Sequence, residues 1–423
     1  MGIDYKFTYK IIDSILLFML VFSTGGLPFV YNRNPLYALF FLSLFIAFVF
    51  FGKKILTKLF NITVISLVII LILLFVNYVF AISEQESKKY FYYFMVASVA
   101  ILTFFHFKNN RNEVILIDRL YFVLKMIMIH AGLSFLAYFF VKSHLFYIMS
   151  QYHENETFYY LFFYSAKGTG LINLFGIEFH RNAGLFWEAG ILQLFLNLFF
   201  FLEAFIVKRN KLLLFITALI LITTYSTAGI AILLIQGMIY IIKEFPKNKI
   251  LAPLALLFLI PVYIIFTSNL NEKVYGEKEA SFQKRLFDLT QPFFIALEHP
   301  LTGIGLDMEK FQEMRQEFYI SSDKIKFFQE ETGIQYKVES TSKGSSNSIM
   351  FLLAAMGFPS AIFLLYMFFT QQIIFTNHLP LMIILVVSAM SEPLFLRPFF
   401  FFFVASGLYA LILKFINNRN HVL

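Results

Sequence analysis

Residues 62–82 read ITVISLVIILILLFVNYVFAI, without a single charged side chain. A helix needs about 20 largely apolar residues to cross the hydrocarbon core of a bilayer, because each residue advances it by about 1.5 Å. This stretch reaches that length by itself. It therefore predicts a membrane-spanning helix, and the neighbouring segments can be tested by the same criterion.

The composition of the whole chain agrees with a membrane protein. Of its 423 residues, 59% are hydrophobic and 14% are charged, and the mean hydropathy is +0.74. Soluble domains carry roughly 25% charged residues and cannot hide so much apolar surface from water. A cytosolic enzyme, a DNA-binding protein and a disordered chain are excluded, and we predict an all-α polytopic membrane protein.

Apolar runs of spanning length recur along the chain and predict about 12 transmembrane helices, with a range of 10 to 12. The runs around Thr223–Thr227 and around Pro393 are short, so one segment at each place could be re-entrant. The predicted spans lie near residues 11–30, 35–52, 62–82, 91–107, 115–142, 183–206, 211–226, 228–243, 249–268, 348–370, 379–391 and 394–414.

Basic residues indicate which ends of these spans face the cytoplasm, where short loops accumulate Lys and Arg. With a cytoplasmic N-terminus, the short outer loops carry only Arg33, Lys88, Lys89 and Arg397. The inner loops and termini carry Lys6, Lys10, Lys53, Lys54, Lys58, Lys108, Arg111, Lys208, Arg209, Lys211, Lys243, Lys247, Lys249, Lys414 and Arg419. The net charge of +8 is thus a topology signal rather than a nucleic-acid signal, and both termini are predicted to be cytoplasmic.

This topology divides the chain into five parts and leaves two long segments on the outer face, each expected to contain short amphipathic helices. The parts are residues 1–142 with five spans, 143–182 as the first outer segment, 183–268 with spans six to nine, 269–347 as the large outer loop, and 348–423 with spans ten to twelve. The first span, from Ile11 onward, is expected to be retained, because no cleavage site precedes a soluble domain.

One group of candidate site residues lies where the chain enters the sixth span, in GIEFHRNAGLFWEAG (residues 176–190). If this stretch is helical, Arg181 and Glu188 share a face about 10 Å apart along the axis. An acid and a base would then flank one groove, beside His180 and the chain's one tryptophan, Trp187. The alternative is an interfacial anchor with charges that reach the surface.

A second group lies in the large outer loop. Apolar residues recur at helical spacing from Ser281 to Glu298 and predict an amphipathic helix that carries Lys284 and Arg285. The helix ends at His299-Pro300, followed by LTGIG (residues 301–305), and the loop closes at GSSNS (residues 344–348). The planar fork of arginine suits a phosphate, and two separated arginines could hold a diphosphate.

No motif indicates a metal or a bound nucleotide. The chain has no cysteine, its eight histidines are scattered, and it contains neither a His-Glu-x-x-His motif nor a phosphate-binding Gly-x-x-x-x-Gly-Lys loop. We therefore expect no cofactor. Chemistry on this chain would depend on an already activated donor carried by a lipid.

Four short stretches, taken in order, resemble the Wzy-type O-antigen and capsule polymerases and the related O-antigen ligases. They are RNAGLFWE (residues 181–188), STAG (residues 226–229), Arg285 with HPLTGIG (residues 299–305), and SNS (residues 346–348) with Gly357 inside the next helix. The resemblance covers residues 176–365. The first five spans resemble the family only in their number and hydrophobicity.

The resemblance implies an inverting, metal-independent glycosyltransferase that acts on undecaprenyl-diphosphate-linked sugars. Arg181 and Arg285 would bind the donor diphosphate and stabilise it as leaving group. Glu188 would orient the acceptor or act as the general base, and His180 and His299 are the alternative bases. The remaining residues expected to bind substrate are Lys284, Trp187, Asn347 and Arg397.

Two alternatives stay open beside a repeat-unit polymerase. An O-antigen ligase carries a histidine before the asparagine of the fourth stretch, and Ser346 at that position favours a polymerase. A flippase or transporter for lipid-linked sugars would need ionisable residues along a path through the membrane, whereas the distinctive charges here cluster at the outer face.

The resemblance also implies a location and partners. The protein would lie in the bacterial inner (cytoplasmic) membrane with its active site facing the periplasm. Its donor and acceptor would be undecaprenyl-diphosphate-linked oligosaccharides within the lipid bilayer, and a chain-length co-polymerase and a flippase would be its protein partners. No nucleic acid is expected.

Overall fold

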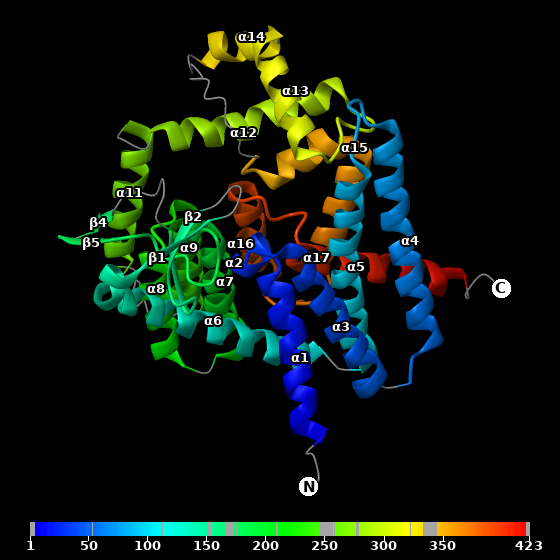
Figure 1. The fold of residues 1–423 in the computed structure, drawn as a ribbon, viewed down its shortest axis with the longest axis horizontal. Coiled ribbons are helices and arrows are strands. Elements are labelled where there is room, and N and C mark those ends of the chain that lie inside the picture. Colours follow the sequence, from blue (N-terminus) through cyan, green and yellow to red (C-terminus); the bar gives the residue numbers. More distant parts are fainter. Residues whose placement is uncertain are drawn as a thin grey trace. The chain divides into compact units, whose positions relative to one another are not determined.

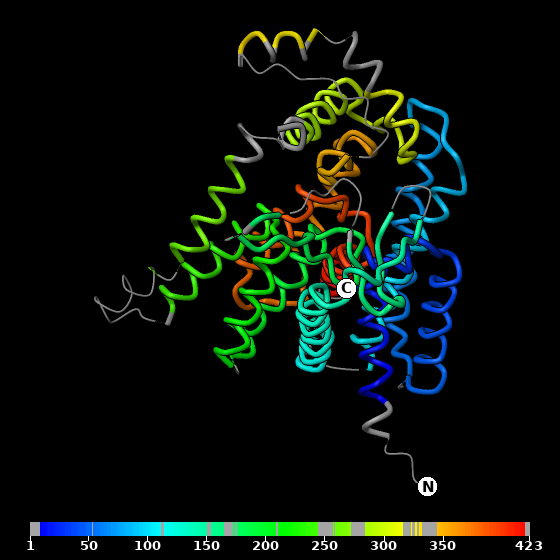
Figure 2. The backbone as a smooth tube through the Cα atoms, turned by 60° about the vertical axis from the view of Figure 1, so that its left-hand side comes forward, coloured from blue at the N-terminus to red at the C-terminus, as the bar shows by residue number. Residues whose placement is uncertain are grey.

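The structure is a computed structural model, and the parts that it describes are coloured in Figure 2. They are residues 5–52, 54–110, 113–149, 154–165, 172–174, 176–208, 210–244, 257, 259–275, 279–321, 323–332 and 345–419. The chain forms two compact units. Unit 1 comprises Met1–Ser43, Val114–Glu272 and Phe375–Ser388, and unit 2 comprises Leu44–Glu113, Lys273–Ile374 and Ala389–Leu423.

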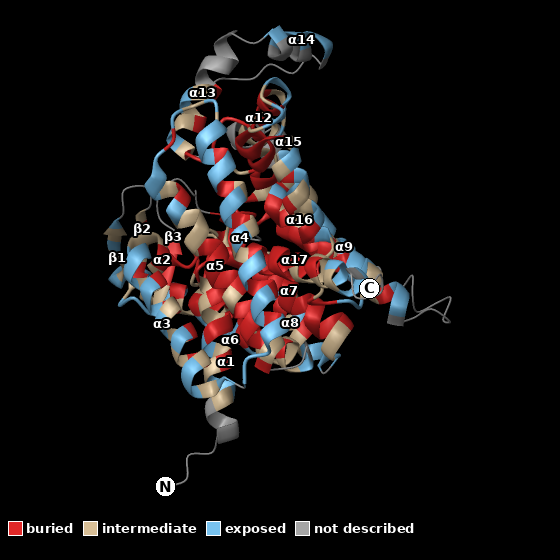
Figure 3. Cartoon of the chain, turned by 90° about the vertical axis from the view of Figure 1, so that its right-hand side faces the viewer, coloured by how far each residue is buried: buried red, intermediate tan, exposed pale blue. Residues whose placement is uncertain are grey.

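Unit 1 is built around α7 (Ala189–Phe201), every residue of which is buried and which is red throughout in Figure 3. A π-helical turn, Leu202–Val207, continues α7, and α8 (Lys211–Thr223) and α9 (Thr227–Glu244) pack against it. A helix that is apolar on all sides buries its whole circumference. The other helices lying wholly or mainly in this unit are α1 (Tyr5–Phe22), α2 (Leu27–Tyr31), α6 (Glu113–Val141) and α11 (Ile260–Tyr275).

Unit 2 contains α4 (Thr57–Phe80) and α5 (Ser87–Asn110), which lie side by side in Figure 1 and pack against α17 (Pro398–Arg419). The long helix α12 (Glu279–Glu298) packs against α15 (Ser348–Phe369), which in turn contacts α17. Two shorter polar helices follow α12, namely α13 (Met308–Ser321) and α14 (Asp323–Thr332). The remaining helices, α3 (Arg33–Phe51) and α16 (His378–Ser391), contribute residues to both units.

Within the described residues, seven helices are long and apolar enough to cross a membrane, which supports a polytopic helical membrane protein. They are Arg33–Phe51, Thr57–Phe80, Ser87–Asn110, Val114–His144, Ala189–Val207, Ser348–Phe369 and Pro398–Asn418. Three shorter apolar helices correspond to predicted spans: Lys211–Thr223, Thr227–Lys243 and His378–Ser391. Of the predicted span 249–268, residues 249–256 and 258 lie outside the described residues, and residues 260–268 lie in a helix that begins at Ile260. The total of about 12 stays a prediction.

The first predicted span, residues 11–30, is not one continuous helix. Helix α1 ends at Phe22, and a turn leads into the short α2. Pro28 lies in the first turn of α2, where its missing N–H costs nothing, but within a continuous helix it would remove a hydrogen bond. The apolar run predicted one helix, but Gly25, Gly26 and Pro28 divide it into two.

The expectation of short amphipathic helices in residues 143–182 is wrong. Beyond a 3₁₀ turn at Lys142–His144, the described part forms five strands: β1 (Phe146–Met149), β2 (Glu154–Phe158), β3 (Phe162–Ser165), β4 (Ile172–Leu174) and β5 (Ile177–Phe179). The first three form an antiparallel sheet in the order β1-β2-β3, and β4 pairs with β5. Burial alternates along β1 and β2, and aromatic and β-branched residues suit such half-buried strands.

Candidate functional site

The stretch that carries Arg181 and Glu188 is not helical, so the shared helix face expected for them does not exist. Strand β5 ends at Phe179, and α7 begins only at Ala189, with Glu188 as its N-cap residue. The intervening backbone pairs with the α1–α2 turn, since Leu27 donates to the Leu185 carbonyl at 3.0 Å and Trp187 donates to the Gly25 carbonyl at 3.1 Å. These partners replace the hydrogen bonds of the expected helix.

Arg181 is held at the junction of α8 and α9. Its Nε donates to the Thr224 carbonyl at 3.0 Å. The adjacent Asn182 is buried and donates from its backbone N–H to the Thr223 carbonyl at 3.1 Å and from Nδ2 to Thr223 Oγ1 at 3.0 Å. The start of the first stretch is therefore attached to residues 223–224, directly before the second stretch, within unit 1.

The junction itself is held by Asn269 of α11, which was not predicted from the sequence. Tyr225 has a positive φ of 47°, which is uncommon for a residue with a side chain. Asn269 on α11 donates to the Tyr225 carbonyl at 2.9 Å and accepts from Thr227 Oγ1 at 2.7 Å. Asn269 is fully buried, and an amide in an apolar helix was the one signal that could have identified it.

The other predicted site residues of unit 1 are half-buried. Glu188 forms no capping hydrogen bond with the first turn of α7, although a carboxylate is favoured at that helix end. The His180 ring lies 5.6 Å from the Tyr138 ring, and its Nδ1 is buried without a hydrogen-bond partner among the described residues. Glu188 and His180 thus both stay candidates for a general base.

Arg285 lies on the predicted amphipathic helix, which the structure confirms as α12. Its Nη2 donates to Glu392 Oε1 over 3.4 Å, at the link between α16 and α17. Its Nη1 is buried and has no hydrogen-bond partner among the described residues. The guanidinium is therefore incompletely paired, and it retains the capacity to bind an anion. Lys284 beside it is half-buried.

The third and fourth stretches are joined by a break in α15. Gly357 has φ 71° and ψ 168°, and Pro359 has no N–H to offer the Ala355 carbonyl. Phe358 donates instead to the Pro300 carbonyl at 2.8 Å. The carbonyls of Ala354 and Ala355 are thereby released, and they accept from Ile304 at 3.0 Å and from Gly305 at 2.9 Å. The loop that follows His299 is fixed to α15 by this exchange of backbone partners.

A buried asparagine on α4 completes this attachment. Asn77 Nδ2 donates to the Thr302 carbonyl at 2.6 Å and to the Ala355 carbonyl at 2.9 Å. Its Oδ1 accepts from the Tyr90 hydroxyl at 2.6 Å. A polar side chain inside an apolar span needs such partners, and Asn77 interrupts the apolar run of residues 62–82. Its position in that run was a signal, but Thr302 and Ala355, which accept from its amide, lie more than two hundred residues away.

A buried ion pair lies beneath the fourth stretch. Asp288 on α12 accepts from Arg315 Nη2 at 2.7 Å through Oδ1, and through Oδ2 it accepts from Ser346 N and Oγ at 2.8 and 2.6 Å. Arg315 also donates to Gln291 at 2.7 Å. Burial lowers the pKa of Arg315, and Asp288 opposes that effect. The pair connects α12, α13 and the start of α15, and no motif in the sequence indicated it.

Asn347 and Arg397, both predicted to bind substrate, have partners within the protein. Asn347 is the N-cap residue of α15, where its side chain accepts from Met350 N at 3.1 Å. Arg397 Nη1 donates to the Tyr92 hydroxyl at 3.1 Å. Asn347 therefore has a local structural role, whatever it contributes to a substrate.

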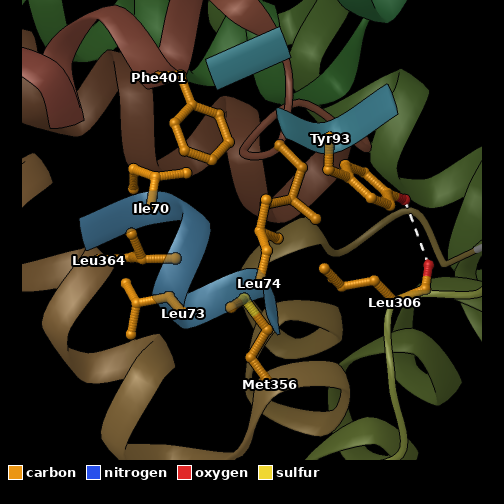
Figure 4. A pocket seen from close by; sticks show the side chains of 9 residues that line it. Ile70, Leu73, Leu74, Tyr93, Leu306, Met356, Leu364 and Phe401 are labelled. Carbon is orange, nitrogen blue, oxygen red and sulfur yellow. Dashed lines mark hydrogen bonds between the residues drawn. The ribbon is translucent and has the colours of Figure 1, made fainter. Parts of the chain in front are cut away.

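The small pocket in Figure 4 does not resemble a site for a polar substrate. Aliphatic and aromatic side chains of α4, α5, α15 and α17 surround it, including Ile70, Leu74 and Phe401. The one hydrogen bond drawn there joins the Tyr93 hydroxyl to the Leu306 carbonyl at 3.3 Å. Its volume of about 10 Å³ is close to one water molecule, so it is a gap in packing.

The predicted site residues thus fall into two groups. Unit 1 holds His180, Arg181, Trp187 and Glu188 on the segment that enters α7. Unit 2 holds Lys284 and Arg285 on α12, His299 at its end, Asn347 at the start of α15, and Arg397 in the link before α17.

Residues 212–365 match the model of a protein family described as O-antigen ligase. The matched stretch contains Arg285, His299, Asn347 and Gly357, whereas Arg181 and Glu188 precede it. A search of curated proteins finds no match to the chain. The family match supports the O-antigen ligase and polymerase superfamily, and with it a membrane glycosyltransferase-like enzyme of polysaccharide biosynthesis.

Proposed function

We propose that this protein is a polysaccharide repeat-unit polymerase of the O-antigen type. It transfers a growing glycan from undecaprenyl diphosphate to the sugar of a new lipid-linked repeat unit, at the outer face of the bacterial inner membrane. The family match supports the superfamily, and the polymerase assignment goes beyond it.

The observation that carries the proposal is the incomplete hydrogen bonding of the Arg285 guanidinium. Its guanidinium lies on an amphipathic helix inside the matched region. It has one long contact to a carboxylate, and one buried nitrogen has no hydrogen-bond partner in the described part of the chain. An unsatisfied buried donor costs roughly 1–3 kcal/mol, and an anionic ligand removes that cost. A diphosphate is the anion that the lipid-linked donor presents.

The proposed reaction is a single inverting displacement. A hydroxyl of the acceptor sugar attacks the anomeric carbon of the donor, and the bond from that carbon to the diphosphate oxygen breaks. The electron pair leaves with undecaprenyl diphosphate, whose developing charge Arg285 stabilises, with Arg181 assigned to the same donor by the family pattern. The hydroxyl proton passes to a base, for which Glu188 is the first candidate and His180 and His299 are the alternatives.

A ligase is the second candidate, because the matched family is described by that activity. Ser346 argues against it. The ligases carry a histidine at this position, whereas Ser346 here is half-buried and donates its hydroxyl to the buried Asp288 at 2.6 Å. Ser346 is therefore assigned to the support of α15 rather than to proton transfer.

The test is the display of glycan on a gel, in a strain that lacks the gene and is complemented with wild type, Arg181→Ala, Arg285→Ala or Glu188→Gln. We expect wild type to restore a ladder of repeat units and the variants to leave a core-plus-one-unit band at equal protein abundance. A deletion strain that accumulates long lipid-linked polymer would identify a ligase. A normal ladder from all three variants would show that these residues are structural.

A further inference from the structure

Glu392 lies in the link between α16 and α17, outside the four stretches and outside the matched region. Its side chain is only 6% exposed, and its Oε1 lies 3.4 Å from Arg285 Nη2. A buried carboxylate needs a countercharge or hydrogen-bond donors to offset its lost hydration. Arg285 provides such a charge.

The turn that carries Glu392 is fixed by the first residue of α15. Ser348 Oγ donates to the Ala389 carbonyl at 2.6 Å and accepts from Phe395 N at 3.1 Å. It therefore bonds to the backbone three residues before and three residues after Glu392. Inside the turn, Leu394 donates to the Glu392 carbonyl at 2.8 Å. The carboxylate is therefore presented from a rigid position, and Ser348 of the fourth stretch connects through it to Arg285.

Glu392 orients Arg285 without saturating it. The 3.4 Å separation is long for a charged hydrogen bond, which is usually about 2.7–2.9 Å. The Arg285 side chain is 40% exposed, and its Nη1 has no partner among the described residues. A guanidinium restrained at one nitrogen loses less freedom when a phosphate binds to the others.

We propose that Glu392 is a positioning residue for Arg285. It restrains the guanidinium for binding of the donor diphosphate, and in this respect the inference rests on the proposed function. The carboxylate has two opposing effects, because its hydrogen bond orients the arginine while its negative charge repels the diphosphate. The two effects can be separated by substitution, since glutamine retains an acceptor oxygen at the same reach and carries no charge.

The experiment is calorimetric titration of the purified full-length protein in detergent with inorganic pyrophosphate. We expect Arg285→Ala and Glu392→Ala each to weaken binding about tenfold or more, a difference that titration resolves easily. Glu392→Gln should bind as tightly as wild type or several-fold more tightly. The double variant Arg285→Ala/Glu392→Ala should bind no more weakly than Arg285→Ala, because the orienting effect of Glu392 is lost together with that side chain. Glu313→Gln, an exposed carboxylate of the same unit, is the matched control and should change nothing.

Several results would overturn the inference. The first is that pyrophosphate binding to wild type does not depend on Arg285. The second and third are that Glu392→Ala binds with wild-type affinity, or that Glu392→Gln binds as weakly as Glu392→Ala. The fourth is that the double variant binds more weakly than Arg285→Ala by the factor that Glu392→Ala shows alone. If Glu392→Ala does not unfold cooperatively on heating, Glu392→Asp replaces it. That variant keeps the charge but withdraws the carboxylate by one methylene, so we expect weaker binding, and unchanged affinity would contradict the proposal.

The glycan ladder separates this inference from the proposed function. If wild type fails to restore a ladder while the pyrophosphate results hold, the polymerase assignment is wrong and the Glu392–Arg285 anion site stands. If the ladder is restored and the Glu392 variants bind pyrophosphate like wild type, only the positioning role is wrong.

Discussion

Asp288 and Arg315 show how a single pair of side chains can support a site without belonging to it. Both are almost fully buried, and Asp288 also accepts two hydrogen bonds from Ser346. A buried ion pair stabilises little compared with apolar packing, but loss of one partner leaves the other charge buried and uncompensated. The pair is therefore expected to be sensitive to change even if it contacts no substrate.

We expect Asp288→Asn to destabilise unit 2 by about 3–5 kcal/mol, because the Arg315 charge loses its partner. The measurement is the thermal unfolding midpoint of the purified protein in detergent. Lys310→Ala is the control, since the Lys310–Glu313 pair is solvent-exposed and should leave the midpoint unchanged. Equal effects of the two substitutions would contradict the assignment of Asp288 as a buried support.

Asn347 is a second case, in which a predicted substrate-binding residue has a structural role. Asn347→Ala should cost about 1 kcal/mol through loss of the N-cap, whereas Asn347→Ser keeps a capping oxygen and should be nearly neutral in stability. Glycan display with Asn347→Ser then decides the substrate role. A normal ladder would limit Asn347 to capping, and a lost ladder at normal abundance would support contact with substrate.

The break in α15 shows how one helix can attach a loop through backbone hydrogen bonds. The conformation of Gly357 and the missing N–H of Pro359 release two carbonyls, and the loop after His299 supplies the N–H groups that satisfy them. A continuous helix would have no carbonyls to offer. The sequence spacing of HPLTGIG and the later glycine is explained by this backbone pairing.

Gly357→Ala should prevent this pairing. A Cβ at this position would clash with the carbonyl of Leu301, in addition to backbone strain of about 1–3 kcal/mol. We expect a large drop in the unfolding midpoint and in protein abundance. Gly176→Ala is the matched control, because Gly176 also has a positive φ, of 82°, but an added Cβ there would contact nothing within 4 Å. A comparable loss in both variants would assign the effect to strain alone.

For the chain as a whole, hydrophobic runs predict most of the helical elements. The spans predicted at 62–82 and 348–370 correspond closely to Thr57–Phe80 and Ser348–Phe369, since long apolar runs have few other solutions. The sequence did not indicate the strands of residues 146–165. Their alternation is short, and long-range pairing decides between a strand and a short helix there.

The candidate site was predictable only where its residues carry a motif. Arg181, Arg285 and Gly357 lie in recognisable stretches, and the structure gives each a specific environment. Glu392 and Asn269 had no local pattern, because their roles depend on partners more than forty residues away in the chain. The same limit explains the error at Arg181 and Glu188, where pairing with the α1–α2 turn replaced the expected helix.

The predicted orientation of the protein can be tested directly, because the chain contains no cysteine and any introduced thiol is unique. Tyr160→Cys, at the exposed tip of the β2–β3 hairpin, should react with a membrane-impermeant maleimide in intact spheroplasts. Lys54→Cys and Lys414→Cys should react only after permeabilisation. Labelling of Lys54→Cys or Lys414→Cys from outside would contradict the assignment of cytoplasmic loops and termini.

The most direct test of the polymerase claim uses the purified protein and lipid-linked repeat units extracted from the deletion strain, with the products followed by mass spectrometry. We predict that wild type forms glycans of two and more repeat units on undecaprenyl diphosphate, with one undecaprenyl diphosphate released per bond formed, and that Arg285→Ala forms none. Transfer only when a separate acceptor without the lipid carrier is added would contradict a polymerase. Undiminished elongation by Arg285→Ala would contradict the proposed site.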